Sequence, residues 1–150
     1  MSPSRILVIL AAMVSAPILA QKGIEYRSVG ESAAILYDAP TVRGKKLFVA
    51  PRGMPLEVVV SIEGWQKVRD RSGDLTWIER RFVSDRRTVV SVAGAQVRER
   101  PEDGAPVVLE VSPNVVFDLV DAPRTGGAWV RVRHRDGASG FIRAAQIWGI

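Results

Sequence analysis

The chain of 150 residues is 47% hydrophobic, contains four tryptophans and has a formal net charge of +5. This apolar content favours a packed fold over a disordered chain. With no cysteine and one histidine, the sequence excludes disulfide cross-links and a cysteine nucleophile, and a zinc site built from histidine and cysteine is not expected.

The first 20 residues have the zones of an export signal in the expected order. Arg5 supplies a positive charge, residues 6–14 form an apolar core, and small residues precede Gln21. The apolar stretch is shorter than the roughly 20 residues that a membrane-spanning helix needs, and Pro17 interrupts it. We therefore predict a signal peptide over residues 1–20, a periplasmic or otherwise exported protein, and no stable membrane insertion after cleavage.

Short β-type segments alternate with turn residues through residues 21–84. Residues 21–31 are polar and contain two glycines, so we expect a lead without a strand. The segments that follow are a first strand at 32–38, a loop at 41–46, a short apolar run at 47–49, a turn-rich segment at 51–55, a long strand at 56–62 and a hairpin from 65 onward. No segment has a convincing helical pattern, which favours an all-β fold.

The hairpin occurs twice in the chain. Residues 65–83 and 129–147 align without a gap, so that Trp65 corresponds to Trp129 and the other matched positions lie at the same spacing. A repeat of this length predicts two small units, at 21–84 and 88–150, joined by a linker too short to let them move far apart. We expect three further aromatic residues to pack inside, with Trp77 and Phe141 in the two cores and Trp148 covering the bottom of the second unit.

These residues resemble the bacterial Src-homology-3 (SH3) domain family. The second unit carries VRERP at 97–101, WVRV at 129–132 and GASGFI at 137–142, and the first carries GWQKV at 64–68 and TWI at 76–78. Two departures are Thr76 where the family prefers glycine and Phe141 where it prefers tryptophan. The resemblance implies an all-β fold of two tandem SH3-like barrels, a fold that serves wall binding, peptide binding and structural roles.

The residues give no sign of an active site. His134 is the one histidine and lies between two arginines, with no nucleophile motif around it. None of the 16 acidic residues lies in a recognisable hydrolase motif. We therefore expect a protein that is not an enzyme and that uses no cofactor or metal.

The tryptophans that begin the two hairpins are the main candidates for binding. One interpretation is cross-strand packing, and the other is a stacking platform for a peptide. The first unit places Tyr37 near this platform where the second has Arg98, and residues 21–87 carry 13 basic against 9 acidic residues, compared with 7 of each in 88–150. We therefore predict a ligand-binding site made of Tyr37, Arg43 and Trp65.

Arginines alternate along one face of each hairpin, at 69 and 71 in the first and at 131, 133 and 135 in the second. A solvated sheet face is one interpretation, and a basic stripe for carboxylates or anionic wall polymer is the other. The positive charge is too weak and too dispersed to predict nucleic-acid binding. The sequence thus favours an exported, non-catalytic tandem module that binds cell-wall peptide or wall material. The alternative is a structural subunit that docks on another periplasmic protein.

The export prediction can be tested directly. We expect the mature protein to begin at Gln21, because residues 1–20 hold the positive, apolar and small-residue zones. Intact-mass measurement of the protein purified from its host checks this, and recovery of a chain that still begins at Met1 would contradict it.

Overall fold

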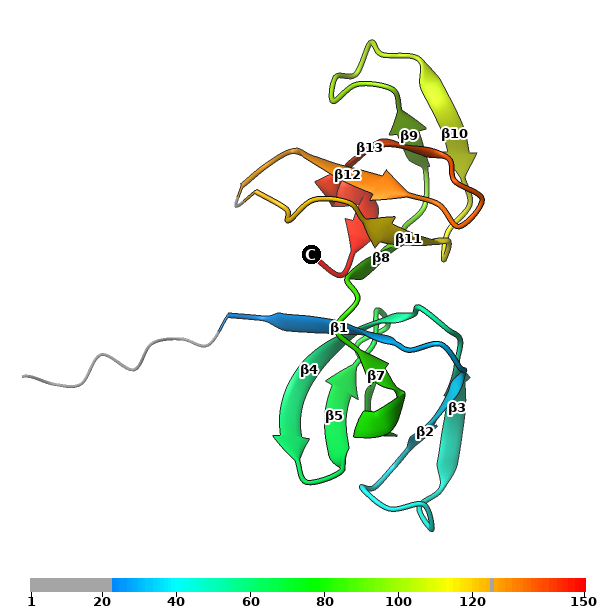
Figure 1. The fold of residues 1–150 in the computed structure, drawn as a ribbon, viewed down its shortest axis with the longest axis vertical. Coiled ribbons are helices and arrows are strands. Elements are labelled where there is room, and N and C mark those ends of the chain that lie inside the picture. Colours follow the sequence, from blue (N-terminus) through cyan, green and yellow to red (C-terminus); the bar gives the residue numbers. More distant parts are fainter. Residues whose placement is uncertain (1–22, 125) are drawn as a thin grey trace, which may run out of the picture.

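The computed structural model describes residues 23–124 and 126–150. They form two all-β units, each built on one sheet of seven antiparallel strands that curls upon itself (Figure 1). The predicted signal peptide lies outside the described residues. Within them, no helix is long and apolar enough to cross a membrane.

The first unit follows the predicted chain order with one addition. Its strands pair in the order β3-β2-β6-β5-β4-β1-β7. The bounds are β1 Glu25–Val29, β2 Ala34–Tyr37, β3 Lys46–Ala50, β4 Pro55–Ile62, β5 Trp65–Arg69, β6 Leu75–Glu79, a 3₁₀ turn at Arg80–Phe82 and β7 Val83–Ser84. Residues 21–31 were expected to be a lead without a strand, which is wrong. Strand β1 forms there because Tyr26 and Ser28 are buried between β4 and β7, while Glu25 and Arg27 alternate outward.

The second unit repeats this plan strand by strand. Its order is β10-β9-β13-β12-β11-β8-β14, so each strand has the same neighbours as its counterpart in the first unit. The bounds are β8 Thr88–Ser91, β9 Ala95–Arg98, β10 Val107–Val111, β11 Val116–Leu119, β12 Trp129–Arg133, β13 Ser139–Arg143, a 3₁₀ turn at Ala144–Gln146 and β14 Ile147–Trp148. The hairpin repeat seen in the sequence is therefore one part of a duplicated barrel.

Each unit has its own apolar core. Trp77 in the first unit and the matching Phe141 in the second lie outside these cores. Ile78 in β6 and Ile142 in β13 are fully buried, whereas the preceding residues, Trp77 and Phe141, are half-buried. Successive side chains of a strand point to opposite faces, so the burial of the isoleucines turns their neighbours outward. The prediction that Trp77 and Phe141 belong to the cores is therefore wrong. Trp77 instead lies under the ammonium group of Lys67, with the Nζ atom 5.9 Å from the ring centroid.

The departure at Thr76 coincides with a real difference between the units. In the second unit the equivalent residue is Gly140, and a Cβ atom there would lie 2.4 Å from the carbonyl oxygen of Arg98. Strands β9 and β13 thus approach so closely that only glycine fits without a shift. In the first unit Thr76 occupies this position and is buried, with its hydroxyl unpartnered among the described residues.

The two units contact each other through side chains at their boundary. Thr88 Oγ1 at the start of β8 donates a hydrogen bond of 2.7 Å to the carbonyl oxygen of Gly53. The Trp148 ring meets Tyr26 of β1 edge-on, with the ring centroids 5.2 Å apart and an interplanar angle of 84°. Trp148, expected to cover the bottom of the second barrel, lies at its boundary with the first unit and contacts Tyr26 there.

The assignment of the cores gives a mutational test. Replacing Ile78 or Ile142 by alanine should lower the free energy of unfolding by about 2–5 kcal/mol, as for other buried isoleucines. Trp77→Ala should cost less than Ile78→Ala, because the Trp77 ring is half-exposed. Urea unfolding of the three variants measures this, and a larger loss for Trp77→Ala than for Ile78→Ala would contradict the assignment.

The contact between the units gives a second test. Trp148→Ala removes an aromatic pair worth about 0.5–1.5 kcal/mol beyond its buried area. Because its partner is Tyr26, we expect hydrogen exchange of the β1 amides in the other unit to become faster. Ile150→Ala, at an exposed neighbouring position, is the matched control. Unchanged exchange of β1 in the Trp148 variant would show that the units do not stabilise each other through this pair.

Candidate functional site

Tyr37 and Trp65 meet in the first unit. Trp65 begins β5 and is half-buried, while Tyr37 ends β2 and is only 5% exposed. Their rings pack edge to face, with centroids 5.5 Å apart and an interplanar angle of 82°. Tyr37 therefore supports the Trp65 ring from behind, and Trp65 supplies most of the exposed aromatic surface of this pair.

The loop after Tyr37 is closed by its own polar groups. The Asp38 carboxylate accepts a hydrogen bond of 2.8 Å from the backbone N–H of Lys45, and the Asp38 N–H donates to the Lys45 carbonyl at 3.1 Å. Gly44 packs inside the loop, where a Cβ atom would lie 2.8 Å from the Asp38 carboxylate. These bonds hold the two ends of the loop together and fix the position from which its side chains project.

Arg43 lies on this loop and is exposed. Its backbone N–H donates to Thr41 Oγ1 at 3.2 Å. Among the described residues, its guanidinium forms no ion pair, and neither do the ammonium groups of Lys45 and Lys46. The structure thus joins Tyr37 to Trp65 and places Arg43 on the adjoining loop, without a side-chain contact from Arg43 to either ring.

The corresponding tryptophan of the second unit is covered by an arginine. The guanidinium carbon of Arg143 lies 4.8 Å from the Trp129 ring centroid. Arg143 is held there by Asp103, whose two carboxylate oxygens accept hydrogen bonds from Nε and Nη2, and this arginine lowers the pKa of the Asp103 carboxyl. Arg98, which replaces Tyr37, is bound to the carbonyl oxygen of Ala105 at 2.7 Å. The two tryptophans therefore have different surroundings although their strands are equivalent.

Some of the arginines that alternate along the two hairpins form ion pairs, and others do not. Arg69 forms an ion pair of 2.7 Å with Glu57, and Arg131 lies 3.9 Å from the Asp121 carboxylate. Arg71, Arg133 and Arg135 have no ion pair within the described ranges. These contacts neutralise part of each row, so a continuous basic stripe along the hairpins is less well supported than the cationic loop beside Trp65.

His134 has a local structural role. Its Nδ1 atom lies 2.9 Å from the Asp136 carboxylate, and its ring packs against Phe117 with centroids 5.5 Å apart. The described part of the chain holds no group of three or more histidine, aspartate or glutamate residues arranged to bind a metal. His134 thus belongs to the packing of its turn.

A groove of about 730 Å³ lies where the two units meet, and sequence reasoning did not find it. The first unit contributes Leu47, Phe48 and Leu75 to its lining, and the second contributes Val116 and Trp148. The sequence showed a short apolar run at 47–49, which the structure places in β3, but its exposure depends on how that strand is placed in the sheet. The opposite wall exists only because the second unit packs against the first.

Two curled sheets of short antiparallel strands, each closed by a 3₁₀ turn and a last two-residue strand, define a tandem of small SH3-like barrels. The model of the family described as bacterial SH3 domain matches residues 30–85 and 91–149. The chain therefore belongs to the bacterial SH3 domain family, with two tandem copies. The predicted fold class and the resemblance to this family are confirmed.

The solved structures that match include two NlpC proteins and one NlpC/P60 family protein. NlpC2 and NlpC1 from Trichomonas vaginalis are 13% and 15% identical, with TM-scores of 0.38 and 0.39; the matches cover 83% and 93% of this chain and 48% and 50% of those chains. An NlpC/P60 family protein from Bacillus cereus is 16% identical with a TM-score of 0.39, covering 83% of this chain and 56% of that one. The chain thus spans about half the length of these proteins. Comparison with curated proteins gave no match.

Proposed function

We propose that this protein is an exported, non-catalytic tandem SH3 module that binds carboxylate-bearing peptide of the cell envelope through its first unit. Bacterial SH3 domains are binding modules. The observation that carries the proposal is the Trp65 ring, backed by Tyr37 and adjoining a loop whose cations have no ion pairs among the described residues. Export rests on the sequence pattern of residues 1–20.

The two parts of this surface suit different parts of a peptide. The indole ring offers a flat apolar area that can pack against the peptide body, and Tyr37 restricts its movement, so that little conformational entropy is lost on binding. The Arg43 guanidinium can hold a carboxylate through two hydrogen bonds. The loop that carries Arg43 is already closed by Asp38, which reduces the cost of ordering it when a ligand binds.

The difference between the units points to the first as the binding unit. In the second unit Arg143 covers Trp129 and is itself engaged by Asp103. A ligand that stacked on Trp129 would have to displace this arginine from its ion pair. Trp65 has no such cover among the described residues, so an incoming peptide meets its ring directly.

A structural subunit that docks on another periplasmic protein is the second candidate. The observation that favours it is a set of exposed apolar side chains on β4 of the first unit: Val59, Val60 and Ile62. Exposed apolar side chains that lie together are a common feature of protein interfaces. In this case the protein would bind its partner and not the wall.

Binding to purified sacculi separates the two candidates. We expect retention of the protein that falls as salt rises, because part of the attraction is between ionic groups. Trp65→Ala should weaken retention by about tenfold or more, as for a tryptophan central to an interface. Trp129→Ala is the matched control and should bind like the original protein.

Each variant must also be compared by its thermal melting. Arg43→Gln should weaken retention and reduce its salt dependence while leaving melting unchanged, because Arg43 is exposed. If the protein is not retained even at low salt, the docking subunit is favoured. If Trp65→Ala binds less only in proportion to its lost stability, Trp65 is a packing residue and the proposed site is wrong.

A further inference from the structure

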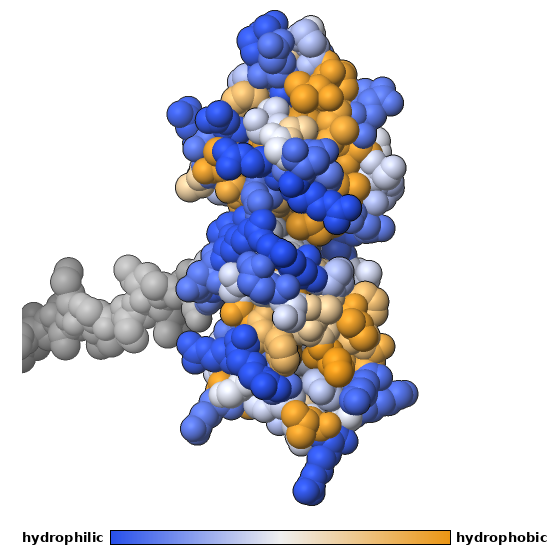
Figure 2. Space-filling view, turned by 45° about the vertical axis from the view of Figure 1, so that its right-hand side comes forward, coloured by the Kyte–Doolittle hydropathy of each residue, from blue (hydrophilic) through white to orange (hydrophobic). Residues whose placement is uncertain are grey.

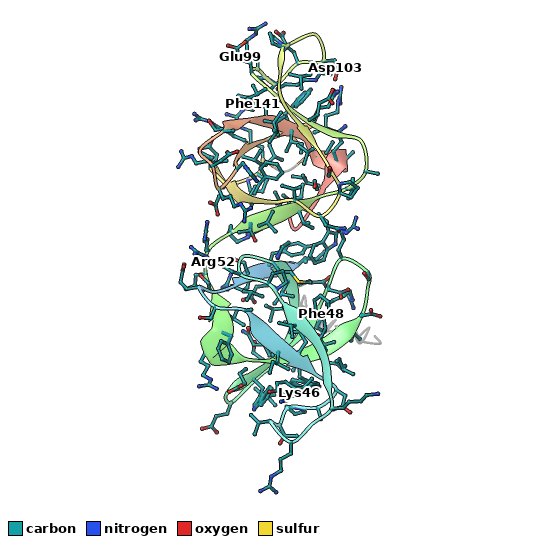
Figure 3. All side chains as sticks on the ribbon, turned by 90° about the vertical axis from the view of Figure 1, so that its right-hand side faces the viewer. Lys46, Phe48, Arg52, Glu99, Asp103 and Phe141 are labelled. Carbon is teal, nitrogen blue, oxygen red and sulfur yellow. The ribbon has the colours of Figure 1, made fainter. Side chains whose placement is uncertain are left out.

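Strand β3 forms an open edge of the first sheet. It is the terminal strand in the sheet order, and β2 is its one hydrogen-bonded neighbour. Four of its five residues, at 46–49, are exposed, and the Phe48 side chain is 52% exposed. An edge strand presents backbone N–H and C=O groups that can pair with another extended chain. Figure 3 shows Phe48 and Lys46 on this side of the unit.

The groove between the units runs beside this edge. Leu47 and Phe48 line it from β3, Met54 and Leu75 from the rest of the first unit, and Val116 and Trp148 from the second. Figure 2 shows apolar atoms gathered on the side of the first unit that carries β3, with hydrophilic side chains around them. The groove has a volume of about 730 Å³, which lies within the range of ligand sites. A hollow of this size can enclose a few side chains, which a flat surface cannot.

The turn between β5 and β6 gives the groove an excess of negative charge. Asp70, Arg71 and Asp74 all line it. One Asp70 oxygen accepts the Asp74 N–H at 3.0 Å, but neither carboxylate has an ion pair with any described residue, and Arg71 provides the single positive charge of this turn. Two uncompensated carboxylates against one guanidinium favour a cationic group on an occupant.

The groove also has one buried hydroxyl group in its lining. Thr76 lines it, is only 6% exposed, and its hydroxyl lacks a hydrogen-bond partner within the described ranges. A buried hydroxyl without a partner is costly, and most such groups are satisfied by protein, water or ligand. The second unit has glycine at this position, so the corresponding site there has no hydroxyl group.

We propose that the outer edge of β3 and the groove beside it form a second binding site, which takes an extended basic polypeptide segment by β-strand addition. The segment pairs its backbone with β3 and places alternate apolar side chains beside Phe48 in the groove. Basic side chains at the ends of the segment, on the same face as its apolar side chains, lie near Asp70 and Asp74. The edge strand selects a polypeptide, because backbone pairing is what an open edge offers.

This site is separate from the surface at Trp65. The groove shares no residue with Tyr37, Trp65 or Arg43, although Lys46 belongs both to β3 and to the cations beside Arg43. The loop at Arg43 suits a carboxylate, whereas the turn at Asp70 suits a cation. The proposal therefore does not depend on wall binding. Failure of one site leaves the other unaffected.

A fluorescein-labelled heptapeptide with lysine at positions 1 and 7, valine at positions 3 and 5 and threonine at the other positions is the probe, because its lysines and valines then share one face. We expect saturable binding by the purified protein in an anisotropy titration at low salt. Phe48→Ser should weaken it by about tenfold or more, while Val108→Ser on β10, where the side chain is 45% exposed, should leave it unchanged. Asp74→Asn should weaken binding and reduce its dependence on salt. Trp65→Ala should bind the probe normally.

Peptide variants test the mode of binding without altering the protein. N-methylation of alternate amides on one edge of the probe removes its backbone donors and should abolish binding. A peptide with glutamate in place of lysine should bind at least about tenfold more weakly. The proposal is overturned if the original protein does not bind the probe, if N-methylation has no effect, or if Phe48→Ser binds equally well. It is also overturned if sedimentation shows that a second copy of the chain occupies this edge and is released by Phe48→Ser.

Discussion

The hydrogen bond from Thr88 to the Gly53 carbonyl, buried at the boundary of the units, is the contact on which the larger arrangement depends. It joins the first strand of the second unit to the turn before β4, and the edge-on contact of Trp148 with Tyr26 lies at the same boundary. A buried polar pair of this kind is costly to separate, because each group would lose its partner. It therefore favours one arrangement of the two barrels, and the groove between them follows from it.

Duplication gave the two units the same strand order but different surfaces. At the position that Tyr37 occupies beside Trp65, the second unit has Arg98, and there Arg143 lies over Trp129. The edge strands differ in where their charge lies, since β3 has the exposed Val49 where β10 carries Glu110, and Lys46 where β10 has Val107. A charge on an edge strand opposes pairing with another chain. The first unit therefore offers the more open aromatic ring and an edge strand whose charge lies at its first residue.

Particular residues show which features of the structure could be predicted from the sequence. The spacing of the two hairpins, with glycine and aspartate in their turns, predicted the duplicated barrel, because turns and strand alternation are local properties. The burial of single aromatic residues was predicted less accurately. Trp77 and Phe141 are large and apolar, yet the fully buried Ile78 and Ile142 take the inward positions. Which face of a strand points inward depends on the strands that pair with it and pack against it. Strand β1 was missed because its polar residues outnumber its apolar ones.

The sequence by itself determined the fold class, the family and the duplication, since these follow from motifs and from spacing along the chain. Tertiary structure alone decided which side chains are covered. Arg143 lies over Trp129, the β3 edge is left open, and a groove forms from Phe48 and Trp148, which are 100 positions apart. The physical reason is that a groove or a cover needs surfaces brought together by packing, and no local pattern records the packing of distant strands.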